Sequence, residues 1–163
     1  FGDFILLQKI KTQKWIDFIV NSFAQTGKSI SVEQAQYIAD VMKNHSWYVQ
    51  QLSHYTWNKV EKITETNDIT TALQELIQAN TPLYQREVEI LSSTQLQLLK
   101  AIASNETQFT STLVMNTYSI GTPNNILKNK QILLKNDIVY EDNGRLYFLD
   151  PAFEIWFNSL FIK

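Results

Sequence analysis

The chain has 163 residues, of which 44% are hydrophobic and 12% aromatic, which suits one domain or two small ones with a well-filled core. Because it contains no cysteine, disulfides and thiolate metal sites are excluded, and no run of eighteen uncharged apolar residues predicts a membrane span. The net charge is −2 and no charged-then-apolar leader is recognisable, so we expect a cytoplasmic protein without membrane contact.

Helical periodicity begins at residue 13, and the residues before it give no clear helix signal. The chain opens on Phe1-Gly2 rather than on Met, so we expect it to be a piece of a longer protein. Gly27 is expected to end the first helix, because glycine accepts the left-handed conformation that often follows a helix. The residues predicted to share the inward face of this helix are Trp15, Phe18, Ile19, Ser22 and Phe23.

Three more helices are predicted before residue 81. The segment Ser31-Val-Glu-Gln34 is a capping box, in which each of the two side chains bonds the backbone N–H of the other residue. A helix of about 46–62 follows, and Asp68 is expected to cap the next one. The predicted inward residues of these helices are Ala35, Ile38, Ala39 and Met42; Val49, Leu52, Tyr55 or Thr56, and Val60; and Ile69, Ala72, Leu73, Leu76 and Ile77.

Residues 82–135 carry further helix signals. The pair Thr81-Pro82 is expected to open a new short helix, and Ser92 or Ser93 can cap the one after it. A short helical segment at about 110–118 leads into a turn at 119–121, after which Thr122 is expected to cap a helix with Pro123 in its first turn. The apolar residues of the two longer helices are Leu96, Leu99, Ile102 and Ala103, and Ile126, Leu127, Ile132 and Leu133.

Two β-rich runs, 138–140 and 146–149, follow and are joined through Asn143-Gly144. An Asn-Gly pair between such runs is a strong hairpin signal, because both turn residues must take positive φ. Asp150-Pro151 then begins a strongly apolar last helix, whose aromatic residues lie on more than one side and are expected in the core. Three short helices with a glycine turn before the third, followed by a hairpin, predict a winged helix-turn-helix.

The predicted fold class is therefore mainly α. A helical bundle is expected over residues 1–80 and a winged helix-turn-helix domain with a small β-hairpin over residues 81–163. Since no Gly/Ser-rich linker separates the two parts, we expect them to pack against each other.

Two features of the first part resemble functional motifs without fulfilling them. The segment Thr26-Gly-Lys-Ser29 looks like the end of a phosphate-binding loop, but Ser22 stands where that loop needs its first glycine and a helix rather than a strand precedes it. His45 and His54 have no further ligand at metal-binding spacing. No pattern of nucleophile and base points to catalysis, so we expect this chain not to be an enzyme and to hold no cofactor.

The predicted helix 122–135 offers side chains that can contact DNA. Thr122, Asn124, Asn125 and Lys128 lie in its N-terminal half, and Arg145 lies in the hairpin, where such residues can reach bases and phosphates. A polar solvent-facing side or an interdomain contact is the alternative, and it is favoured because DNA-binding domains are usually basic. The charges over 92–163 balance: Lys100, Lys128, Lys130, Lys135, Arg145 and Lys163 against Glu106, Asp137, Glu141, Asp142, Asp150 and Glu154.

Dispersed residues over nearly the whole chain carry a family resemblance. In the first part they are Trp15-Ile-x-Phe18-Ile, Phe23, Thr26-Gly-Lys28-x-Ile30, and Asn44-His-Ser-Trp-Tyr-Val-Gln-Gln-Leu52 with Trp57. In the second part they are Leu91-Ser-x-x-Gln95 with Leu98-Leu-Lys-Ala-Ile-Ala103, Phe109-Thr-Ser111, Gly121-Thr-x-x-Asn125, and Asp150-Pro-x-Phe-Glu-x-Trp-Phe157. These patterns resemble the helical lid and the C-terminal winged helix of the archaeal-type ATPases, P-loop NTPases of the STAND branch related to AAA+ proteins.

The resemblance implies that the chain is the C-terminal half of a larger ATPase, whose P-loop and acidic Walker B residue would lie upstream. ATP and Mg²⁺ are then the expected cofactors of the full-length protein. The turn Asn44-His45-Ser46 would face the nucleotide, where relatives have Gly-His-Pro, so only His45 matches. Ser46 is still suited to cap the helix that follows.

The function predicted from these observations is a non-catalytic regulatory and docking module of a P-loop ATP-binding protein. Its expected partner is the N-terminal nucleotide-binding domain of the same protein, with a further protein partner or self-association left open. The alternative is a DNA-binding winged helix that contacts double-stranded DNA. The two differ in charge placement: DNA binding requires the basic residues of the winged helix on one face, whereas docking predicts an apolar patch beside a mixed-charge rim.

Overall fold

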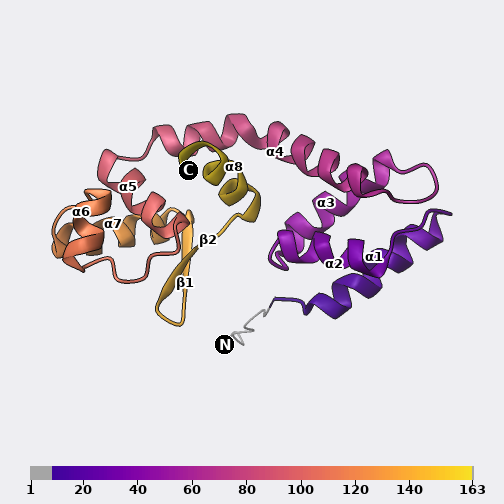
Figure 1. The fold of residues 1–163 in the computed structure, drawn as a ribbon, viewed down its shortest axis with the longest axis horizontal. Helices are drawn as coiled ribbons and strands as arrows, with labels where there is room; N and C mark the ends of the chain where they lie inside the picture. Colours follow the sequence, from indigo (N-terminus) through magenta and orange to yellow (C-terminus); the bar gives the residue numbers. More distant parts are fainter. Residues whose placement is uncertain (1–8, 163) are drawn as a thin grey trace, which may run out of the picture. The chain divides into compact units, whose positions relative to one another are not determined.

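The computed structural model describes residues 9–162, which fold into eight helices and one two-stranded antiparallel sheet (Figure 1). The predicted fold class, mainly α with a small hairpin near the C-terminus, is confirmed. The chain divides into two compact units, residues 1–78 and 79–163. Among the described helices, none combines the length and the apolar composition needed to cross a membrane.

The first unit contains α1 (Thr12–Gln25), α2 (Val32–Val41), α3 (Ser46–Lys59) and the beginning of α4 (Thr66–Glu89). Helices α1 and α3 run parallel to each other. The side chains of Thr12 and Asn44 hydrogen-bond at the start of both helices, and those of Thr26 and Trp57 hydrogen-bond at the end of both. Helix α2 packs against α1 and α3, so the three helices enclose a common core.

Most of the predicted inward face of the first unit is confirmed. The capping box forms at the start of α2: the Ser31 hydroxyl accepts the Gln34 N–H, and the Gln34 side-chain carbonyl accepts the Ser31 N–H at 3.0 Å. Leu73 and Ile77 are only half-buried. The predicted residues that are buried are Trp15, Ile19 and Phe23; Ala35, Ile38, Ala39 and Met42; Val49, Leu52, Thr56 and Val60; and Ile69, Ala72 and Leu76.

The prediction that Phe18 faces inward is wrong, because its side chain is 51% exposed. Successive residues of an α-helix are turned by about 100°, so Trp15, Ile16, Ile19 and Phe23 together span about 100° of the helix surface. Phe18 lies about 60° beyond Trp15, outside this sector. Ile16, which the sequence pattern did not single out, is buried in its place.

Helix α3 ends at Lys59, three residues earlier than predicted. Val60 adopts an extended conformation, and the chain then pairs with the loop after α1. The Ser29 N–H donates to the Lys62 carbonyl at 2.7 Å, and the Thr64 N–H donates to the Ser29 carbonyl at 2.9 Å. These bonds pair the backbone groups of Lys62 and Thr64 with Ser29, so the chain after α3 is hydrogen-bonded without continuing the helix.

Two predictions about α4 are wrong. The helix does not break at Thr81-Pro82 but continues to Glu89 with Pro82 inside it. Proline removes one backbone donor from a helix interior. Beyond it, however, Tyr84 is buried against Phe153 and Trp156, which holds the following turn in place. Asp68 is not the N-cap either: its carboxylate accepts the Glu65 N–H at 2.8 Å from the third helical position, which is one half of a capping box.

The second unit contains, after the end of α4, α5 (Ser93–Ala103), α6 (Thr112–Tyr118), α7 (Pro123–Lys135), β1 (Val139–Asp142), β2 (Arg145–Phe148) and α8 (Pro151–Phe161). The predicted caps at Ser92, Thr122 and Asp150 all accept backbone N–H groups of the next helical turn. Asn143 and Gly144 both have positive φ, and the strands pair from Val139 with Phe148 to Asp142 with Arg145. The predicted hairpin is therefore confirmed.

Helix α5 is the centre of the second unit, because α6, α7, α8 and β2 all pack against it. It is consequently buried over a wider sector than the predicted face. Leu99, Ile102 and Ala103 are buried as predicted, Leu98 and Ala101 are buried as well, and Leu96 is half-exposed. Of the apolar residues of α7, Ile126 and Leu133 are buried.

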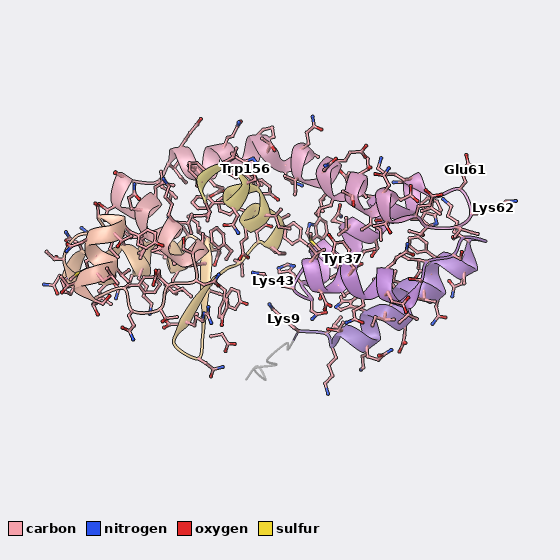
Figure 2. The ribbon with its side chains drawn as sticks, in the orientation of Figure 1. Lys9, Tyr37, Lys43, Glu61, Lys62 and Trp156 are labelled. Carbon is pink, nitrogen blue, oxygen red and sulfur yellow. The ribbon has the colours of Figure 1, made fainter. Side chains whose placement is uncertain are left out.

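Aromatic side chains of α8 complete this core. Phe153 and Trp156 contact Tyr84 of α4, with ring centroids 5.2 and 5.7 Å apart, where α8 lies against the C-terminal part of α4 (Figure 2). Phe157 lies 5.5 Å from Phe148 of β2. The prediction that aromatic residues on two sides of this helix belong to the core is confirmed for Phe153, Trp156 and Phe157.

Gly121→Ala is expected to destabilise the second unit by about 1–2 kcal/mol. Gly121 has φ +84°, and an added Cβ would lie 3.2 Å from Nδ2 of Asn125 in the turn between α6 and α7. Urea denaturation monitored by circular dichroism measures the loss. Ser119→Gly is the matched control, because Ser119 already holds φ +54° and glycine should relieve rather than add strain there. An unchanged stability of Gly121→Ala would contradict the argument.

Candidate functional site

The outward face of α7 contains the polar residues predicted to contact DNA. The Thr122 side chain caps the helix by accepting the Asn125 N–H, and Pro123 occupies the first turn. Asn124, Asn125 and Lys128 are exposed, while Ile126 and Leu133 on the opposite side are buried. The structure therefore gathers four of the five predicted residues at the N-terminal end of one exposed helix.

The fifth predicted residue, Arg145, contacts the loop after α5 and the hairpin. Its guanidinium donates to the Asn105 side chain at 3.2 Å and lies 5.6 Å from the Tyr147 ring. Tyr147 in turn stacks on Tyr140 across the hairpin, with centroids 5.4 Å apart. Arg145 is thus joined to the loop after α5 and to the hairpin's own aromatic pair.

The remaining cations of α7 are divided. Lys130 is ion-paired with Glu141 of β1 at 2.7 Å, so its charge is neutralised by the hairpin. Lys128 and Lys135 are both exposed and lie seven residues apart, which places them on the same side of the helix two turns from each other. Asp142 adds exposed negative charge to the hairpin. Lys128, Lys130, Lys135 and Arg145 therefore do not converge on one face.

A surface pocket of about 250 Å³, named here the α7 pocket, lies beside the start of α7. The loop between α5 and α6, the first turns of α7 and the hairpin turn at Gly144 form its walls. Leu127, 56% exposed at its edge, is an apolar residue of α7 that does not enter the core. The residues that line the α7 pocket are Thr107, Gln108, Phe109, Thr110, Pro123, Ile126, Leu127, Lys130 and Gly144.

Sequence reasoning missed this pocket. The sequence feature that could have indicated the pocket is the pair of adjacent apolar residues Ile126 and Leu127. Neighbouring helical residues are turned by about 100°, so one of the two must lie nearer the surface. Which of the two faces the core depends on where α5 packs. Phe109 and Gly144 reach the same place only through tertiary structure.

The turn Asn44-His45-Ser46 lies in the first unit. Lys43 and Asn44 have positive φ, and the Asn44 side chain exchanges hydrogen bonds with the Thr12 hydroxyl. The predicted cap role of Ser46 is wrong: α3 begins at Ser46, and His45 occupies the N-cap position without a side-chain capping bond. The His45 ring lies 5.1 Å from the Tyr48 ring.

Residues of the phosphate-loop-like segment make structural contacts. Gly27 follows the end of α1 with φ +75°. The Lys28 ammonium donates to the Trp57 carbonyl at 2.7 Å and lies 3.9 Å from the centre of the Trp57 ring. The Trp57 indole N–H donates to the Thr26 hydroxyl at 2.9 Å. These contacts join the ends of α1 and α3.

Glu33 of the first unit has a carboxyl group whose pKa is shifted by hydrogen bonds. The pKa of Glu33 lies below its ordinary value, chiefly because its own backbone N–H bonds the carboxylate and secondly because the Ser31 hydroxyl does. Glu33 stands exposed in the first turn of α2, so the shift reflects helix capping.

Over residues 9–162, no group of three or more His, Cys, Asp or Glu side chains is placed to hold a metal ion.

Comparison with known proteins agrees with the architecture of the second unit. Residues 82–159 match a family described as a probable winged helix domain, and this range includes α5 to β2 and most of α8. No curated protein and no solved structure matches the chain. The second unit is a winged helix domain, and the match does not assign it a function.

Proposed function

We propose that the chain is a non-catalytic regulatory module whose winged helix domain docks onto a protein through the α7 pocket. The observation that carries the proposal is the pocket itself, with Leu127 exposed at its edge and Phe109, Pro123 and Ile126 in its wall. Apolar side chains in a concavity, surrounded by polar ones, are typical of a protein interface. The Lys130–Glu141 ion pair supplies the mixed charge at the rim.

Charge placement supports docking over DNA binding. Affinity for DNA comes largely from the counterions that basic side chains displace from phosphates. In this domain Lys130 is already paired with Glu141, Arg145 bonds Asn105, and Asp142 adds negative charge to the hairpin. Since Asp142 offsets Arg145, the hairpin offers a phosphate backbone beside α7 little net positive charge.

The proposed partner is the nucleotide-binding domain of the same protein, as the resemblance to STAND-branch ATPases suggests. In that protein ATP and Mg²⁺ would bind upstream of this chain, in the cytoplasm. The winged helix would then respond to the nucleotide state by docking and release. This part of the proposal rests on the resemblance and on the α7 pocket as the docking surface.

DNA binding is the second candidate. The observation that favours it is the exposed side of α7, on which Asn124, Lys128, Gln131 and Lys135 follow one another at helical spacing. Asparagine can read adenine and lysine can contact guanine or phosphate in the major groove. The two candidates therefore use neighbouring but distinct sides of the same helix.

Lys128→Ala separates the candidates. The lysine is exposed, so its removal is expected to change stability by less than about 0.5 kcal/mol. Fluorescence anisotropy of a labelled duplex should show no saturable binding to the unchanged chain or to Lys128→Ala at about tens of micromolar protein, even at low salt. Saturable binding that weakens steeply with salt and is reduced by Lys128→Ala, but not by Lys62→Ala in the first unit, would establish the second candidate.

Hydrogen exchange tests docking directly in the longer ATPase that the resemblance predicts. The amides of residues 124–131 should exchange more slowly in the nucleotide state that favours docking, and Leu127→Asp should abolish the difference while leaving the fold intact. Equal exchange in the ATP and ADP states would remove the regulatory role. Loss of the difference in Leu113→Asp, which changes an exposed leucine outside the pocket, would mean that the α7 pocket is not the docking surface.

A further inference from the structure

The middle of α4 carries a further inference, independent of the function proposed for the α7 pocket. The two compact units divide between Gln78 and Ala79, within this single helix of 24 residues. Pro82 lies in the helix interior, about one turn after the division. We name residues 77–83 the α4 junction.

The α4 junction has no buried side chain, unlike the helix on either side of it. Ile69, Ala72 and Leu76 are buried before the junction. Tyr84 is buried directly after it, whereas each side chain of residues 77–83 is exposed or half-buried. A helical segment with few buried contacts opens at a lower free-energy cost than one packed in a core. Packing therefore holds both parts of α4 more firmly than the junction.

Pro82 makes the continuous helix less favourable at the same place. Proline has no N–H, so the Gln78 carbonyl four residues earlier lacks the backbone donor that a regular helix supplies. The proline ring also crowds that carbonyl, and it disfavours the helical conformation of the preceding residue, Thr81. The helix is therefore weakest in the turn where the two units divide.

Elsewhere in this chain a Thr-Pro pair begins a helix. Thr122 adopts an extended conformation, with φ −81° and ψ 162°, and Pro123 follows in the first turn of α7. The Thr122 hydroxyl accepts the Asn125 N–H, which is one of the donors that a helix leaves without an internal partner at its start. A residue before proline favours the extended conformation, so the cap and the proline act together. The start of α7 thus shows the arrangement that is also open to Thr81-Pro82.

A break at Thr81 would remove few hydrogen bonds from α4. In a continuous helix the Leu83 and Tyr84 N–H groups donate to the carbonyls four residues earlier, and Pro82 has no N–H to lose. An extended Thr81 would accept the Tyr84 N–H with its hydroxyl, and its carbonyl would still accept the first bond of the helix that follows. Only the Leu83 N–H would then be left to water.

From these observations we propose that α4 is a conformational switch with two states. In the continuous state, which the structure shows, residues 66–89 form one helix. In the broken state Thr81 is extended and caps a separate helix that begins at Pro82, while residues 66–80 remain helical. Because the units divide inside the α4 junction, the change of state alters the direction in which the chain passes from the first unit to the second. A partner that binds one state more tightly shifts the population towards that state.

A distance along α4 distinguishes the two states. The chain has no cysteine, so spin labels can be attached specifically at Thr70→Cys and Glu89→Cys, two exposed positions on either side of the junction. In the continuous state the Cα atoms of these two residues lie about 28 Å apart. A bend at Thr81 shortens this distance. Double electron–electron resonance should therefore show two components, one of them at the shorter distance.

Pro82→Ala should leave only the longer component, because alanine supplies the missing N–H and no longer disfavours a helical Thr81. Arg86→Ala is the matched control: Arg86 is exposed and lies in the part that is helical in both states, so both components should remain. Three results would overturn the proposal: a single longer component in the labelled chain with Pro82, two components that persist in Pro82→Ala, or an equal loss of the shorter component in Arg86→Ala.

Variants of Thr81 test the cap. Thr81→Ala removes the hydroxyl that bonds the Tyr84 N–H in the broken state, so the fraction of the shorter component should fall at least about threefold. Thr81→Ser retains a hydroxyl and should keep both components. Equal distance distributions in Thr81→Ala and Thr81→Ser would contradict a broken state that begins with this cap.

Hydrogen exchange of the unlabelled chain gives an independent reading. The protection factor of the Leu83 amide should be at least about tenfold lower in the unchanged chain than in Pro82→Ala, since only the broken state exposes this amide. The Leu76 amide, in the part that is helical in both states, should be protected similarly in the two proteins. Because Pro82 is exposed, circular dichroism should show an unaltered fold in Pro82→Ala. Equal protection of Leu83 in the two proteins would also overturn the proposal.

Discussion

Phe157→Ala is expected to lower the free energy of unfolding of the winged helix domain by about 3–5 kcal/mol. Phe157 is 0% exposed, and its ring contacts those of Phe148, Phe153 and Phe161, with centroids 5.5, 5.9 and 4.6 Å away. Truncation to alanine removes the transfer free energy of the ring and leaves a cavity between α8 and β2, whose backbones cannot close over it.

Urea denaturation followed by NMR signals of residues 93–161 measures this loss in the second unit alone. Leu160→Ala is the matched control, because Leu160 lies in the same helix but is 59% exposed. Its expected effect is below about 0.5 kcal/mol. Comparable losses in the two variants would mean that α8 does not present Phe157 to the core.

Leu99→Ala is the second large effect, with an expected loss of about 2–5 kcal/mol. Leu99 is fully buried in α5, the helix against which α6, α7, α8 and β2 all pack. A cavity there removes contacts to several elements at once, so the surrounding structure has little freedom to collapse into it.

The same denaturation experiment tests Leu99→Ala, with Leu113→Ala as its control. Leu113 belongs to the adjacent helix α6 and is 76% exposed, so its truncation removes few contacts. A loss below half a kilocalorie per mole for Leu99→Ala would contradict its place in the core.

Local signals predicted much of the fold correctly because their causes are local. Ser31, Ser92, Thr122 and Asp150 begin helices since each side chain satisfies backbone donors within three residues of itself. Asn143-Gly144 forms the hairpin turn because few other pairs adopt two positive φ values. No distant contact is needed for these features, and the sequence contains everything that decides them.

The wrong predictions share a different cause. Thr81-Pro82 has the local pattern of a helix start, yet α4 runs through it because Tyr84 is packed against α8, far along the chain. Phe18 matches the hydrophobic repeat of α1 but lies outside the sector that α2 and α3 cover. Periodicity identifies the apolar residues of a helix, and the neighbours decide how wide its buried sector is.

The candidate sites divide in the same way. The sequence alone was sufficient to identify the exposed polar start of α7 at Thr122, Asn124, Asn125 and Lys128, because capping and helical spacing decide which residues lie there. It could not show that Glu141 neutralises Lys130 or that Arg145 bonds Asn105. Those partners are 11 and 40 residues away, and only the packed domain brings them together.

Composition, caps and turns thus determined that this chain is mainly helical and ends in a winged helix, since each signal acts over a few neighbouring residues. Tertiary structure alone decided where its surface pockets lie. The α7 pocket needs Phe109, Leu127 and Gly144 from three separate segments, and the alignment of α1 with α3 needs the Thr12–Asn44 and Thr26–Trp57 contacts. A concave surface is a property of packed elements, and no single segment of the sequence encodes it.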